Sequence, residues 1–172
     1  IKSNILFPTL LYDLISKKAN KIINFGSMMQ HDAGEKFQSK NFYSATKNAF
    51  EMINNFYKHK EKSTKFYNLK LYESFGENDN RKKLIPTIIR NYKKRKTTVI
   101  LSKNLELNII HVDDIIKALN ILLNNNIKPG SYCLKNNKNV KISNLINNFN
   151  RKLERKIKVK YLRKSVKKIS TS

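Results

Sequence analysis

The stretch from Lys21 to Lys47 reads KIINFGSMMQHDAGEKFQSKNFYSATK, and it decides the fold. Its opening run, KIINF, is typical of a short buried strand, because branched and aromatic residues dominate it. Gly26 and Ser27 follow that strand, and a helix is predicted over 43–59. A strand that leads through a loop into a helix is the repeating unit of an α/β protein.

Three side chains of this stretch form a candidate proton-transfer site. Tyr43 and Lys47 are four residues apart, so they project from the same face of a helix. An ammonium group near a phenol favours the phenolate form that a general acid/base must reach. Ser27 ends its strand, and ligands of open α/β sheets bind at the carboxyl edge. We therefore expect Ser27 to hydrogen-bond the same substrate oxygen as Tyr43.

The rest of the chain alternates between helical and strand patterns. Apolar residues recur at helical spacing over 3–19, and further helices are predicted over 81–96, over 115–123 and from Ser143 onward. Strands are predicted over 65–72, 97–101, 105–110, 131–134 and 157–162. Asp113 and Ser143 are suitable N-caps for the helices that follow them. The alternation predicts an α/β fold with a parallel sheet.

Four segments, in matching order, resemble the extended branch of the short-chain dehydrogenase/reductase superfamily, the NAD-dependent epimerase/dehydratase family. They are the segment from Asn4 to Leu11, the Ser27 and Tyr-x-x-x-Lys constellation, LKLYESFGEND at 69–79 and IIHVDDI at 109–115. The last is similar to the family's Phe-Ile-His-Val-Asp-Asp-Val. The resemblance implies the carboxyl-terminal part of a Rossmann-type parallel sheet plus a small α/β substrate-binding subdomain.

The resemblance also implies roles for the candidate residues. In the family the nicotinamide exchanges a hydride with a sugar carbon, the tyrosine exchanges the hydroxyl proton, and the lysine holds the nicotinamide ribose. Tyr43 and Lys47 are accordingly the expected catalytic and cofactor-binding residues, and Ser27 the catalytic and substrate-binding residue. The implied cofactor is NAD or NADP, and the implied partner is a nucleotide-sugar substrate.

Three further residues are expected to bind the substrate. Glu73 stands where many relatives place an asparagine that holds the sugar nucleotide, which puts that contact in doubt. Arg81 and Lys82, with Lys83 after them, stand where a loop leads into the predicted helix 81–96, a suitable place to meet a diphosphate. Solvated cations at a helix start are an equal alternative.

The residues after Ser27 limit which reactions of the family are expected. Dehydratases of the family carry an acidic pair there, whereas this chain has Met28 and Met29, whose thioethers cannot transfer protons. Dehydration is therefore disfavoured unless Asp32 or Glu35 reaches the site, and 4-keto reduction or epimerisation remains. The local motifs are most similar to the CDP-abequose synthase-like reductases of the family, which make deoxysugars for surface polysaccharides.

The sequence lacks a Gly-x-x-Gly-x-x-Gly turn, because its four glycines are far apart. That turn holds the cofactor pyrophosphate in dinucleotide-binding folds. We therefore expect an incomplete NAD(P)-binding domain over 1–130, without its first βαβαβ half and with substrate-facing insertions around 73–110. Residues 131–172 are expected to form part of the substrate subdomain and a basic tail. Such a fragment is expected to be inactive alone, and its sheet to have an open edge.

The formal net charge of +24 allows a second class of function. Such a charge suits a polyanion or nucleic-acid binder, but the lysines are spread evenly and no nucleic-acid motif is found. Compositional drift toward lysine on solvated surfaces is the favoured explanation, and no nucleic-acid partner is expected. A family relative that has lost catalysis is a third alternative, which the retention of Ser27, Tyr43 and Lys47 disfavours.

The remaining expectations concern location and assembly. The apolar run from Ile5 to Ile15 is too short to span a bilayer, so no membrane association is expected. The single cysteine, Cys133, is expected in the core, which is consistent with a reducing cytoplasm. No metal is expected, because His111 beside Asp113 suits helix capping better. A homodimer through the helices 3–19 and 43–59 is one possible assembly.

Overall fold

The computed structural model describes residues 1–31, 39 and 41–163. They divide into two compact units, one from 1–72 with 116–134 and one from 73–115 with 135–163. The predicted division at residue 130 differs from these units, because the strand β7 (Gly130–Leu134) pairs with the first unit. The roles expected for the two parts stay predictions.

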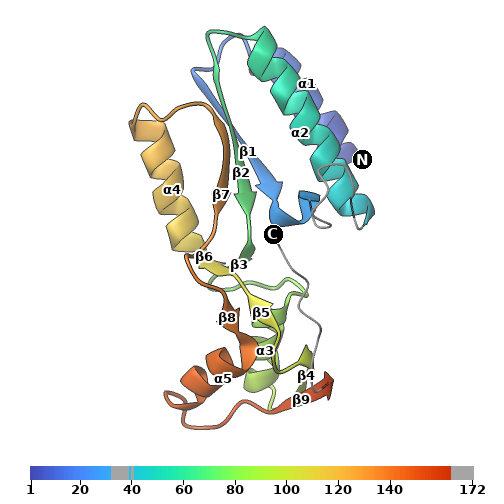
Figure 1. Cartoon of the computed structure of the whole chain (residues 1–172), viewed down its shortest axis with the longest axis vertical. Coiled ribbons are helices and arrows are strands. Elements are labelled where there is room, and N and C mark those ends of the chain that lie inside the picture. The colour runs from blue at the N-terminus through green and yellow to red at the C-terminus, as the bar shows by residue number, and fades with distance from the viewer. Residues whose placement is uncertain (32–38, 40, 164–172) are drawn as a thin grey trace. The chain divides into compact units, whose positions relative to one another are not determined.

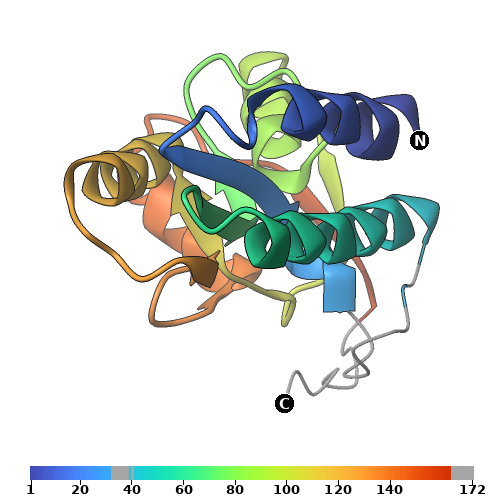
Figure 2. The ribbon, with the colours of Figure 1, turned by 90° about the horizontal axis from the view of Figure 1, so that it is seen from above.

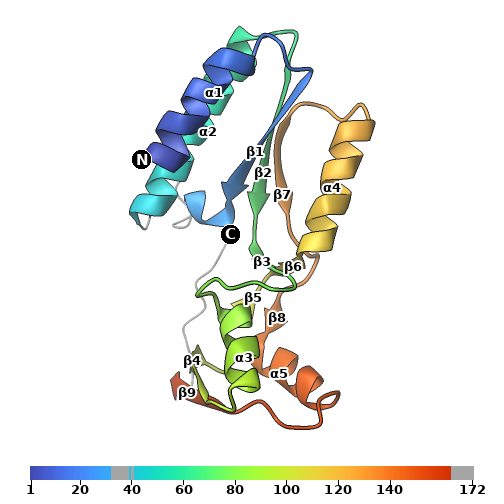
Figure 3. The same ribbon diagram turned by 180° about the vertical axis from the view of Figure 1, so that it is seen from behind.

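The first unit contains a parallel three-stranded sheet in the order β1-β2-β7. Its strands are β1 (Lys21–Ser27), β2 (Lys65–Leu71) and β7. Two helices, α1 (Phe7–Ile15) and α2 (Phe42–Lys60), lie on one side of the sheet, and α4 (Val112–Asn124) lies on the other (Figures 1 and 3). Among the described residues β1 pairs only with β2, so its outer edge is free.

The central strand β2 separates two apolar clusters, because neighbouring strand residues point to opposite faces. Phe66 packs with Tyr12, Phe50 and Tyr57 of the helices α1 and α2. Tyr67 and Leu69 pack with Leu122 of α4. All three β2 side chains are fully buried, which fits a parallel sheet covered on both faces.

The helices α1 and α2 run side by side (Figure 2) and are joined by hydrogen bonds. Tyr12 donates its hydroxyl proton to Asn54 Oδ1 at 2.8 Å, and Tyr57 donates to Asp13 Oδ1. The sequence predicts one helix over 3–19. In the structure a π-helical turn occupies Lys2–Leu6, so the α-helix α1 that follows it is shorter than predicted.

The second unit is built from short elements around one apolar cluster. Its helices are α3 (Leu84–Lys93) and α5 (Ile142–Asn150), and its strands are β3 (Glu73–Phe75), β4 (Thr98–Ser102), β5 (Glu106–Leu107), β6 (Ile109–His111), β8 (Val140–Lys141) and β9 (Val159–Arg163). The core members are Ile85, Ile88, Ile100, Ile142, Ile146 and Ile157. Three two-stranded pairs, β3-β6, β4-β9 and β5-β8, surround it.

Three local predictions are wrong. Asp113 lies inside the first turn of α4, and its backbone N–H donates to His111 Nδ1 at 3.3 Å, so His111 supplies the capping acceptor. Ser143 is the second residue of α5, and the N-cap is Lys141. Cys133 is exposed on β7 and is not a core residue.

Lys21 provides a measurable test of how α4 is held in the first unit. Its ammonium donates to the carbonyl oxygens of Leu122, Leu123 and Asn125 at 2.6, 2.7 and 3.1 Å, where α4 ends. A cation there complements the helix dipole and satisfies terminal carbonyls. We expect Lys21→Met to lower the free energy of unfolding by about 0.3–1 kcal/mol in urea titrations. Lys62→Met, at an exposed site, is the control, and an equal loss in both variants would contradict this assignment.

Candidate active site

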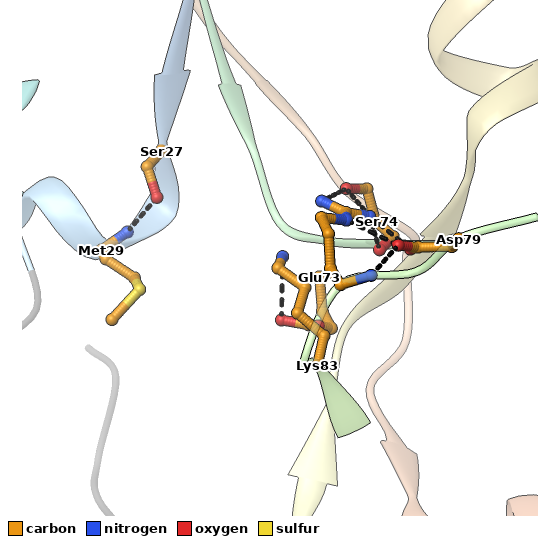
Figure 4. Close-up of polar contacts among 7 residues, drawn as sticks. Ser27, Met29, Glu73, Ser74, Asp79 and Lys83 are labelled. Atoms are coloured by element: carbon orange, nitrogen blue, oxygen red, sulfur yellow. Dashed lines mark hydrogen bonds and ion pairs between the residues drawn. The ribbon is translucent and has the colours of Figure 1, made fainter. Parts of the chain in front are cut away.

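Ser27 ends β1 at the carboxyl edge of the parallel sheet. Its Oγ accepts a hydrogen bond from the Met29 backbone N–H at 3.2 Å, as Figure 4 shows. This bond folds the chain back in the 3-10 turn Met28–His31 and leaves the hydroxyl proton of Ser27 available to a ligand oxygen. The position agrees with the predicted location of ligands in open α/β sheets.

Tyr43 occupies the first turn of α2 because of a helix cap just before it. The Asn41 side chain accepts from the Ser44 backbone N–H at 2.9 Å, and Ser44 Oγ accepts from the Asn41 N–H at 3.3 Å. This capping box starts the helix at Phe42 and so fixes the position of Tyr43. The Tyr43 side chain is 48 % exposed, which leaves it accessible to a ligand.

Lys47 lies one turn further along α2 and reaches back to the strand that carries Ser27. Its Nζ donates to the Phe25 carbonyl oxygen at 3.0 Å. Partial burial lowers the pKa of the Lys47 ammonium below its usual value, because burial disfavours the charged form. Lys47 therefore contacts β1 at Phe25, two residues before Ser27. Tyr43 lies on the same face of α2 as Lys47.

Two residues that the sequence prediction missed connect these elements. Gln30 accepts a hydrogen bond from the Ser27 backbone N–H and donates to the Lys47 carbonyl oxygen and to Glu51 Oε2. Glu51 follows Lys47 by four residues, which is also the spacing between Tyr43 and Lys47. This spacing places Glu51 on the same helix face and was the sequence signal that could have identified it. Nothing in the sequence around Gln30 singles it out.

Two of the other predicted site residues, Glu73 and Arg81, form ion pairs in the second unit, and both pairs are drawn in Figure 4. Lys83 Nζ lies 3.5 Å from Glu73 Oε2. Arg81 binds the Asp79 carboxylate through Nε at 2.8 Å and Nη2 at 2.6 Å, and also donates to the Ser74 carbonyl oxygen at 2.9 Å. These bonds lower the pKa of Asp79 to about 2.

The ion pair with Asp79 bears on the role expected for Arg81. A guanidinium that already binds a carboxylate is neutralised locally, so it offers less attraction to a diphosphate. Lys82 is exposed beside it. A hollow of about 600 Å³ lies next to this loop and is lined by residues that include Asn78, Arg90, Lys93 and His111.

Other candidate groups have structural explanations. His111 Nδ1 lies 3.3 Å from Asp113 Oδ2, and its ring packs edge-on against Phe75. Among residues 1–31, 39 and 41–163, no group of three or more acidic, histidine or cysteine side chains is arranged to hold a metal ion. Asp32 and Glu35, the acidic residues that follow Ser27 in sequence, lie outside the described residues.

A comparison with known protein families identifies the family of this chain. Residues 1–134 match the NAD dependent epimerase/dehydratase family, and the chain belongs to that family. It is 27 % identical over 121 residues to a CDP-abequose synthase of Yersinia pseudotuberculosis, and the match covers 69 % of this chain and 42 % of that protein. A CDP-abequose synthase of Salmonella muenchen is 26 % identical over 136 residues, covering 76 % and 45 %.

Solved structures agree on the fold. A UDP-N-acetylglucosamine 4-epimerase of Methanobrevibacter ruminantium, in complex with UDP-N-acetylmuramic acid, superposes with a TM-score of 0.82 at 22 % identity over 95 % of this chain and 57 % of that one. A dTDP-glucose 4,6-dehydratase of Bacillus anthracis with NAD gives 0.79 at 17 % identity, covering 94 % and 56 %. The predicted fold and family are confirmed. The chain spans about half the length of these relatives.

Proposed function

We propose that this chain carries the proton-transfer site of an NAD(P)-dependent enzyme that reduces or epimerises a nucleotide sugar at a hydroxyl-bearing carbon. The observation that carries the proposal is the link between β1 and α2. Lys47 Nζ bonds to the Phe25 carbonyl oxygen at 3.0 Å, two residues before Ser27, and the accessible Tyr43 lies one helical turn away.

Each of these side chains has a defined task at the reacting oxygen. When bound, the nicotinamide supplies or accepts the hydride at the sugar carbon. Tyr43 gives a proton to the carbonyl oxygen during reduction and takes it back from the hydroxyl during oxidation. Ser27 donates a hydrogen bond to the same oxygen and orients it. The Lys47 ammonium stabilises the phenolate of Tyr43 and holds the nicotinamide ribose.

The residues present fit one end of the cofactor. Tyr43 is accessible and Lys47 is held against β1, as a nicotinamide-ribose site requires. The phosphate-binding glycine turn does not occur in this sequence. We therefore expect the 172-residue chain alone to be inactive and to bind NAD or NADP poorly.

The substrate and reaction are inferred from the relatives and from the residues beside Ser27. Met28 and Met29 supply no proton donor, which favours 4-keto reduction or epimerisation over dehydration. The resemblance to CDP-abequose synthases supports a role in making deoxysugars for surface polysaccharides. Glu73, Arg81 and Lys82 are the proposed substrate contacts, and Arg81 would have to share or release Asp79 to meet a diphosphate.

A spectrophotometric assay of the native polypeptide that carries this sequence tests the proposal. A nucleotide-linked 4-keto-6-deoxyhexose should oxidise NADH or NADPH, which lowers the nicotinamide absorbance. A UDP-hexose, scored by conversion to its epimer without net cofactor consumption, covers the epimerase alternative. Salt-sensitive binding to DNA or RNA without turnover of either sugar would support the polyanion-binding alternative that the charge of +24 allows.

We also propose that the native protein is cytoplasmic and dimerises through α1 and α2. Both helices expose large apolar side chains, with Leu10, Leu14, Met52 and Phe56 each more than half exposed. Leu10 and Leu14 are four residues apart, as are Met52 and Phe56, so each pair shares one face of its helix. Exposed apolar faces of this kind support an interaction site. No helix among residues 1–31, 39 and 41–163 is long and apolar enough to cross a membrane.

Charge insertion tests the dimer. We expect Leu14→Lys and Phe56→Lys each to shift the native protein from dimer to monomer in sedimentation velocity, because a buried unpaired ammonium is costly at an apolar interface. Leu162→Lys, which changes an exposed leucine of β9, is the control and should leave the dimer intact. A dimer that dissociates in Leu162→Lys but persists in both helix variants would contradict the proposed interface.

A further inference from the structure

We propose that Gln30 is a positioning residue of this site, holding Ser27 and Lys47 at a fixed separation through a single side-chain amide. The inference rests on the proposed function, since it concerns the geometry of the same reaction. Gln30 lies in the 3-10 turn after β1 and is fully buried, although it is polar and belongs to a connecting segment.

Both N–H donors and the carbonyl oxygen of the Gln30 amide are hydrogen-bonded. Its Oε1 accepts the Ser27 backbone N–H at 2.5 Å, and its Nε2 donates to the Lys47 carbonyl oxygen at 3.0 Å and to Glu51 Oε2 at 2.9 Å. Rotating the amide by half a turn would face donors with donors and acceptors with acceptors, so only one orientation is satisfied. The amide therefore fixes the spacing between the end of β1 and α2.

Glu51 anchors the amide to the rest of the sheet. Its Oε1 binds Lys70 Nζ of β2 at 2.8 Å and accepts from Ser131 Oγ of β7 at 3.2 Å. The network therefore touches all three strands of the parallel sheet as well as α2. Buried networks in which every group is satisfied resist displacement, because each broken bond leaves a buried polar group unpaired.

Gly26 leaves the space that the amide occupies. A Cβ added at Gly26 would overlap Gln30 Oε1 and would lie 3.0 Å from Asn68 Oδ1. The strand therefore tolerates the buried glutamine only because the residue before Ser27 has no side chain. Lys47 is consequently held twice, by its carbonyl oxygen on Gln30 and by its ammonium on the Phe25 carbonyl oxygen.

Two substitutions in the native protein test the role. Gln30→Met keeps the length of the side chain and removes all three bonds, and Gln30→Glu keeps the shape but loses both N–H donors. We expect kcat for the nucleotide sugar to fall on the order of 10²-fold in each, because small misplacements of reacting groups cost that much. The KM for the sugar nucleotide should change less than about twofold, because Gln30 does not touch ligand.

Ser131→Ala is the matched control. It removes one bond to Glu51 from the same network but touches neither Ser27 nor Lys47. We expect it to lower Tm while leaving kcat within about twofold of wild type. A merely structural role for Gln30 predicts that Gln30→Met and Ser131→Ala reduce kcat in proportion to their loss of Tm, and that result would overturn the proposal.

Amide hydrogen exchange at Ser27 separates this proposal from the proposed function. Gln30→Met, or Gln30→Leu if the first variant does not fold, removes the acceptor of the Ser27 N–H and should speed its exchange at least about tenfold, whereas Ser131→Ala should not. Unchanged exchange at Ser27 overturns the positioning role whatever the activity is. If the wild-type protein turns over no nucleotide sugar, the proposed function fails, and the exchange rates alone decide whether Gln30 holds Ser27.

Discussion

Tyr43→Phe is expected to reduce hydride transfer by about 10²–10⁴-fold in the native protein while sparing nucleotide-sugar binding. The substitution removes only the oxygen that exchanges a proton with the substrate. The first turn of α2 should persist, because its capping box involves Asn41 and Ser44 and leaves the Tyr43 side chain free of that role. The loss should be plain in nicotinamide absorbance with whichever sugar nucleotide is turned over.

Lys47→Ala provides the comparison for Tyr43→Phe. One ammonium is assigned to both the phenolate and the nicotinamide ribose, so Lys47→Ala should lower the rate and weaken cofactor binding together. Tyr43→Phe should lower the rate with a much smaller effect on cofactor affinity. Wild-type turnover in Tyr43→Phe would show that the assigned mechanism is wrong.

Leu69→Ala is expected to have the largest effect on stability, lowering the free energy of unfolding by about 2–5 kcal/mol. Leu69 is fully buried in the central strand β2, opposite Phe25 of β1 and Tyr132 of β7. Truncation there leaves a cavity on the face of the sheet that α4 covers, where Leu69 packs with Leu122.

Leu162→Ala is the matched control for that prediction. Leu162 also lies in a strand, but its side chain is 61 % exposed, so the same truncation should cost less than about 0.5 kcal/mol. Urea titrations of the 172-residue chain, followed by circular dichroism, measure both variants. Equal losses would contradict the placement of Leu69 at the centre of the sheet.

Local patterns were sufficient to predict most elements of the fold. The apolar run of β2 and the four-residue spacing of Tyr43 and Lys47 depend only on neighbours in sequence, and the structure confirms a strand and a helix there. The predicted boundary at residue 130 did not anticipate that β7 returns to the first unit. That return depends on pairing between Leu69 and Tyr132, which are remote in sequence.

The candidate site was predictable in its residue types but not in its connections. Gln30 contacts Lys47 and Glu51 from 17 and 21 residues away, and no local pattern marks such a contact. The pairing of Arg81 with Asp79 spans only two residues, yet two opposite charges in a loop do not reveal whether they bind each other or a ligand. The caps of α4 and α5 were misassigned because α4 begins at Val112, before Asp113, and α5 begins after Lys141 without a side-chain capping bond.

The fate of the hydrogen at sugar carbon 4, measured by mass spectrometry after turnover in deuterated water, tests the central claim most directly. Hydride transfer delivers this hydrogen from the nicotinamide, so the proposed reductase or epimerase should give a product without deuterium on that carbon. The same product should form at least about 10²-fold more slowly in Tyr43→Phe. Deuterium bound to carbon 4 of the product, or no conversion of any nucleotide sugar by the native protein, would contradict the account.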